Sequence, residues 1–176
     1  MDRLPFSPRT LHEFIEADLR RAVRLIIRSQ AELDWQFRFA TPAGDHAVAI
    51  TMPALPAARQ LMLDRIRTLF LWKQAKLFTV AFELEQPDAA AVIGVSHHDR
   101  LGCLTRVRRT PRPWTAANFA PIEWLSSNSI DPAFTGLLPA GSQPMTPQEI
   151  SALQPWFGTD GTYPVVHIET GTLRGI

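Results

Sequence analysis

The sequence has little cysteine and no long apolar run. Its 176 residues include one cysteine, which excludes an intrachain disulfide and fits a reducing compartment. The apolar runs are far shorter than the roughly 18 residues that a membrane span needs, and the first residues lack the apolar segment of a signal peptide. We therefore expect a soluble, cytoplasmic protein that has no membrane partner.

Strong basicity and the common catalytic motifs are also missing. The sequence has no glycine-rich phosphate loop, no nucleophile elbow and no paired Cys-x-x-C motif. A net charge of +1 and a pI near 8.0 are below the values typical of a dedicated nucleic-acid domain. The charge is uneven, however, because residues 1–76 carry 12 basic and 8 acidic side chains whereas residues 123–176 carry 1 and 5. Such asymmetry either steers an anionic partner or reflects complementarity within one fold.

Two long helices are predicted. Over residues 10–30 the apolar residues recur at the spacing of an amphipathic helix. Its cap is either Thr10, which forms a capping box with Glu13, or Ser7, with Pro8 at the first helical position. Over residues 56–75 a second helix begins with Pro56 at its first position. This helix is apolar on all sides, so we expect it to lie in the interior or at an interface.

The alternating segments predict strands. We expect a hairpin over residues 35–52, further strands over 78–84, 89–95 and 103–108, and a last strand within 163–170. Proline is frequent beyond residue 110, which predicts loops and short helices over 131–138 and 147–157. Because strand and helix do not alternate strictly, the fold class is α+β. We expect one domain over 1–176, with a mostly antiparallel sheet of about five or six strands, two main helices, and a Pro-rich segment over 111–176 that wraps the 1–110 core.

The stretch Ser96–Cys103, SHHDRLGC, concentrates residues that perform chemistry. The candidate catalytic residues are His97, His98, Asp99 and Cys103; the candidate metal ligands are His97, His98, Cys103 and His167. Their spacing matches no established metal or nucleophile signature. The competing interpretation is a polar hairpin turn in which Asp99 bonds its own backbone and Cys103 is a small buried apolar residue. We favour the turn, and expect no cofactor.

Arginines follow this stretch without any acidic residue before Glu123. We call this set the arginine strip: Arg100, Arg106, Arg108, Arg109 and Arg112, with Trp114 beside it. Arginine next to aromatic residues is typical of sites for phosphate or nucleic acid. The competing interpretation is a solvated strand face, or ion pairs with the acidic C-terminal third. The carboxylates of Glu83, Glu85 and Asp88 form a further cluster, suited to acid–base or Mg²⁺ chemistry but more often the solvent side of an edge strand.

These observations lead to two hypotheses about function. The leading one is a non-enzymatic binding or regulatory domain, which acts through a protein partner or a second copy of itself, or through an anionic partner such as nucleic acid at the arginine strip. The alternative is a hydrolase, metal-dependent or not, centred on His97, His98 and Asp99.

Overall fold

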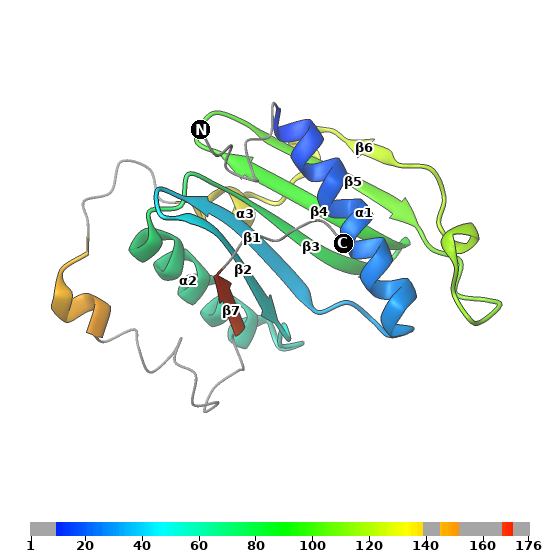
Figure 1. Ribbon diagram of the computed structural model, residues 1–176, viewed down its shortest axis with the longest axis horizontal. Helices are drawn as coiled ribbons and strands as arrows, with labels where there is room; N and C mark the ends of the chain where they lie inside the picture. The colour runs from blue at the N-terminus through cyan, green and yellow to red at the C-terminus, as the bar shows by residue number, and fades with distance from the viewer. Residues whose placement is uncertain (1–9, 139–144, 152–166, 171–176) are drawn as a thin grey trace.

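The structure is a computed structural model that describes residues 10–138, 145–151 and 167–170 (Figure 1). These residues form a seven-stranded antiparallel sheet with the strand order β6-β5-β4-β3-β1-β2-β7. The strands are β1 (Trp35–Thr41), β2 (Gly44–Ile50), β3 (Leu77–Glu85), β4 (Asp88–Ser96), β5 (Arg100–Arg106), β6 (Glu123–Leu125) and β7 (His167–Thr170). The main helices are α1 (Leu11–Ser29) and α2 (Pro56–Lys73), and α3 (Pro132–Thr135) is a short one. The predicted α+β class is confirmed.

Helix α1 covers one face of the sheet. Thr10 caps it as predicted, because the Thr10 hydroxyl accepts a hydrogen bond from the Glu13 amide. Its buried side chains pack with Ala81, Val92 and Cys103, which come from β3, β4 and β5, and Figure 1 shows the helix crossing these three strands. The approach is close, because a Cβ atom at Gly94 would lie 2.7 Å from the side chain of Ile15.

Helices α2 and α3 cover the opposite face. Side chains alternate along β3, so Phe78, Val80 and Phe82 point away from α1 and join the larger apolar cluster with α2 and α3. One side of α2 is buried in this cluster, while Leu61 is 50% exposed. The prediction that α2 also forms an interface stays a prediction.

The hairpins follow the predicted pattern with shifted ends. Gly44 adopts a φ of 127°, which allows the tight turn between β1 and β2. Strand β4 is buried along almost its whole length, as its run of small apolar residues predicts. Strand β5 begins at Arg100, three residues before the predicted start, so the preceding turn is shorter than expected. Strand β6 is not predictable from the sequence pattern, because three residues are too few to show a period.

The chain after residue 130 is described only in parts. Asp131 caps α3 as predicted. The predicted capping box before the next helix is also present, since Thr146 and Glu149 exchange hydrogen bonds. The rest of that predicted helix, residues 152–157, lies outside the described residues, as does the start of the predicted last strand. No helix in the described ranges is long and apolar enough to cross a membrane.

A charged group is buried between α1 and the sheet. Asp18 is 1% exposed, and its carboxylate accepts hydrogen bonds from Arg38 Nη1 at 2.5 Å and from Thr79 Oγ1 at 2.6 Å. Arg21 lies further away, with 3.8 Å between its Nη1 and the Asp18 carboxylate. A buried carboxylate with these partners fixes the position of the helix on the sheet.

Candidate functional site

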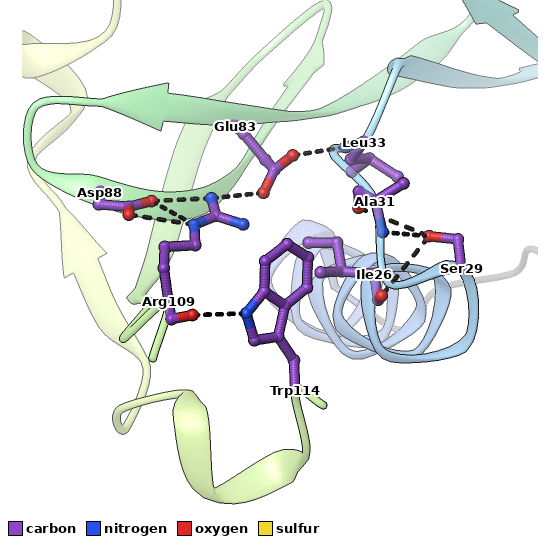
Figure 2. A network of polar contacts seen from close by, with 8 residues as sticks. All are labelled: Ile26, Ser29, Ala31, Leu33, Glu83, Asp88, Arg109 and Trp114. Atoms are coloured by element: carbon purple, nitrogen blue, oxygen red, sulfur yellow. Dashed lines mark hydrogen bonds and ion pairs between the residues drawn. The ribbon is translucent and has the colours of Figure 1, made fainter. Parts of the chain in front are cut away.

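Arg109 lies beside the β3–β4 turn because the chain stays paired with β4 after β5 ends. The Val107 amide donates to the Asp88 carbonyl at 2.9 Å, which brings the next residues to this turn. Arg109 donates hydrogen bonds to the Asp88 carboxylate: Nε lies 2.9 Å from Oδ1 and 3.0 Å from Oδ2, and Nη2 lies 2.7 Å from Oδ1. Nη2 also donates to Glu83 Oε1 at 2.7 Å. One guanidinium therefore pairs with two carboxylates, as Figure 2 shows, and the group keeps a net charge of −1.

Glu83 joins this pair to the first helix. Its other carboxylate oxygen accepts a hydrogen bond from the Leu33 amide in the loop between α1 and β1. Glu83 is only 11% exposed, so its ion pair with Arg109 is well shielded from water. The hydrogen bond to Asp88, followed by the contribution of Glu83, raises the pKa of Arg109 above its ordinary value. The guanidinium thus holds three segments of the chain together.

Trp114 contacts Arg109 through both its indole N–H group and its aromatic ring. Its indole Nε1 donates to the Arg109 carbonyl at 2.8 Å, and its backbone exchanges two hydrogen bonds with the Gln30 side chain at the end of α1. The Cζ atoms of Arg109 and Arg112 lie 5.1 and 4.3 Å from the centroid of the Trp114 ring. Arg109 Nη1 is buried and has no hydrogen-bond partner among the described residues, and the guanidinium as a whole lies within cation–π distance of the Trp114 ring.

A cleft of about 850 Å³ lies over this network, and we call it the Arg109 cleft. Three of its lining residues are half-buried apolar side chains that also pack against the larger apolar cluster, and we call them the floor: Trp35, Met52 and Leu84. We call its charged lining residues the rim: Glu32, Asp34, Glu83, Glu85 and Asp88 together with Arg59, Arg109 and Arg112. The Arg109 cleft is thus lined by both apolar and charged side chains.

The charges of the rim are not balanced. Arg109 pairs with Glu83 and Asp88, and Arg59 donates to the Pro53 carbonyl. The other rim carboxylates are exposed and form no ion pair with another residue in the described ranges: Glu32, Asp34 and Glu85. Five carboxylates against three guanidinium groups give the rim an acidic excess.

The structure divides the arginine strip among separate places. Arg109 and Arg112 line the Arg109 cleft, whereas Arg100 lines a second hollow at the β4–β5 turn. Arg106 forms an ion pair with Glu123 at 2.8 Å, which is the internal pairing that the competing interpretation expected. Arg108 is exposed.

The turn at Ser96–Asp99 is built as the turn interpretation predicts. The Ser96 hydroxyl accepts from the amides of His98 and Asp99, and the Asp99 carboxylate accepts from the Arg100 amide at 2.8 Å. His97 and His98 are both exposed. These residues line the second hollow, of about 500 Å³, which we call the turn hollow.

The other candidates for chemistry lie elsewhere. Cys103 is fully buried under α1, and burial raises the pKa of its thiol to about 12. It therefore faces away from the turn hollow, and a thiol with this pKa is not activated as a nucleophile. His167 lies in β7, which is separated from β4 by three strands. Across the described ranges no group of three or more His, Cys, Asp or Glu side chains is arranged to hold a metal ion.

Sequence reasoning found part of the Arg109 cleft and missed its floor. Arg109, Arg112 and Trp114 belonged to one predicted site and the carboxylates at the β3–β4 turn to another, and the structure brings the two together. Trp35, Met52 and Leu84 were not singled out, because each belongs to an alternating apolar pattern that predicts only a strand. The available signal was their place at strand ends, where a side chain is only half covered.

Comparison with known proteins adds no family to this description. No family model matches the sequence, and neither the curated proteins nor the solved structures give a match. The function is therefore inferred from the geometry of the chain's own residues.

Proposed function

We propose that this protein is a non-enzymatic binding domain, and that the Arg109 cleft receives a segment of a partner protein. The segment carries an apolar side chain flanked by basic residues. The observation that supports this proposal is the combination of a half-buried apolar floor with an acidic rim. Specific protein interfaces commonly have an apolar centre surrounded by a polar margin.

The floor determines the central side chain of the partner. Trp35, Met52 and Leu84 leave part of their apolar surface in water, and an inserted Leu or Phe side chain would remove that surface from it. Aromatic and methionine side chains are frequent at such anchor points because they offer a large or adaptable contact area.

The charges of the rim determine which charged side chains the partner segment carries on either side of its apolar residue. Glu83 and Asp88 share the single charge of Arg109, which reduces their attraction for a further cation. Glu32, Asp34 and Glu85 are exposed carboxylates, to which Lys or Arg side chains of the partner would be attracted. Exposed charges of this kind increase the rate and the specificity of association more than its final affinity.

The network beneath the cleft lowers the cost of binding. Arg109 ties the β3–β4 turn to the segment after β5, and Glu83 ties both to the loop after α1. The walls of the cleft are therefore held in place before a partner arrives, so little conformational entropy is lost on association.

Fluorescence anisotropy with short labelled peptides tests this proposal. The supporting result is binding of a peptide with Leu or Phe between arginines, and clearly weaker binding of the same peptide with glutamates instead. The variant Met52→Glu should abolish binding, because it places a charge on the apolar floor. The triple variant Glu32→Gln, Asp34→Asn, Glu85→Gln should weaken binding about tenfold at low salt, and less at high salt.

Two matched controls separate the cleft from general surface effects. Leu61→Glu puts the same charge on an exposed leucine of α2, and Glu13→Gln removes an exposed carboxylate of α1; both lie outside the Arg109 cleft. Both controls should bind as the wild type does. Equal affinity for the basic and acidic peptides, or equal loss in Leu61→Glu and Met52→Glu, would overturn the proposal.

A further inference from the structure

The turn hollow is a second concave site, separate from the Arg109 cleft. It lies where the β4–β5 turn meets the segment around residues 127–138, on the face of the sheet that α2 and α3 cover. The two lining sets share no residue. Any ligand of this hollow is therefore independent of the partner proposed for the Arg109 cleft.

Five of its polar side chains have donors that make no hydrogen bond within the described part of the fold. The guanidinium of Arg100, the imidazoles of His97 and His98, and the side chains of Ser127 and Asn128 line the hollow. Their side chains make no hydrogen bond or ion pair with another described residue. This sets Arg100 apart from Arg106 and Arg109, whose guanidinium groups are paired with carboxylates.

One carboxylate, that of Asp99, also lines the hollow, and one of its oxygens is bonded within the turn. Asp99 Oδ1 accepts the hydrogen bond of the Arg100 amide at 2.8 Å. The Ser96 hydroxyl holds the amides of His98 and Asp99 at 3.3 and 3.0 Å. These bonds fix the backbone of the turn, and the turn carries three residues that line the hollow, His97, His98 and Arg100.

We propose that the turn hollow binds a phosphate monoester group. Arginine matches the geometry of phosphate oxygens through its fork of N–H donors. Imidazole, hydroxyl and amide groups supply the additional donors that such a group uses. Val95, Thr135 and Leu138 complete the wall on the inner side, and leave room for the organic part of a small ligand.

Binding is measured by ¹H–¹⁵N NMR titration of the full chain with inorganic phosphate at constant ionic strength, with chloride as the reference anion. The amides of His98, Arg100 and Asn128 should shift with phosphate and not with chloride. O-phosphoserine and a nucleoside monophosphate, titrated in the same way, identify which source of the phosphate group fits. Stronger binding of either than of inorganic phosphate supports a monoester.

The variant Arg100→Met should weaken phosphate binding at least about tenfold, the loss typical of a charged hydrogen-bond donor. Arg108→Met removes an exposed arginine outside the hollow and should leave the affinity unchanged. His97→Ala with His98→Ala should weaken binding as well, and peptide binding at the Arg109 cleft should persist in all three variants. Shifts no larger than those with chloride, or equal losses in Arg100→Met and Arg108→Met, would overturn the inference.

Discussion

The buried carboxylate of Asp18 offers the sharpest test of the fold. In Asp18→Asn the side chain keeps its shape but loses its charge, so the largely buried Arg38 guanidinium faces a neutral amide. Removing one partner of a buried ion pair costs about 3–5 kcal/mol. For a chain of this size each kcal/mol lowers the melting temperature by about 2–4 °C, so we expect a decrease of roughly 6–20 °C.

The assay is chemical and thermal unfolding, with an ion pair on the same helix as the control. Glu16 and Arg20 form an exposed pair one turn apart, and Glu16→Gln should cost no more than about 0.5 kcal/mol. The double variant Asp18→Asn, Arg38→Gln completes a thermodynamic cycle, which should give a coupling energy of at least about 2 kcal/mol.

Two results would refute the reasoning about Asp18. One is an equal loss of stability in Asp18→Asn and Glu16→Gln. The other is a coupling energy below about 0.5 kcal/mol, which is the level of a surface pair. Either result would mean that the carboxylate is not shielded from water between α1 and the sheet.

Three further predictions concern buried positions. Cys103 should react with a disulfide reagent only at the rate of local unfolding, and at an ordinary thiol rate in denaturant; fast reaction of the native protein would contradict its burial. Gly94→Ala should lower stability by about 1–3 kcal/mol because the new methyl group overlaps Ile15, and Gly102→Ala, with 3.3 Å to its nearest neighbour, should lower it less in the same unfolding assay. Burial lowers the pKa of His46 below its ordinary 6.5. As the pH decreases, His46 is therefore protonated in the unfolded chain before it is protonated in the folded protein, and stability falls as the pH decreases below 6.5. His46→Gln should lose this part of the pH dependence in urea unfolding between about pH 7.5 and pH 5.5, and an unchanged slope would contradict the assignment.

The sequence was sufficient to predict the main elements because their signals are local. Helix periodicity and the Thr10 cap located α1 almost to the residue, and alternation located the strands of the two hairpins. The first error was the start of β5, where Arg100 and Leu101 pair with β4 although they follow a polar turn. The second was the omission of β6, whose three residues form a strand only because they pair with β5.

For the candidate sites too, contacts between neighbours in the chain were predictable and contacts between distant residues were not. Asp99 bonding its own turn was predictable, because Asp forms this bond through neighbouring atoms. The partners of Arg109 were not, because Glu83 and Asp88 lie 26 and 21 residues away in the chain. A run of arginines in the sequence cannot reveal which of them face carboxylates.

The sequence by itself determined the main elements, the antiparallel class of the sheet and the polar character of the β4–β5 turn, since these depend on residues close together in the chain. Only the tertiary structure decided where the charges of the arginine strip lie: Arg106 paired with Glu123, Arg109 held by two carboxylates over Trp114, and Arg100 left open in the turn hollow. The physical reason is that the pairing of a charge depends on distance in space, and strand order sets that distance.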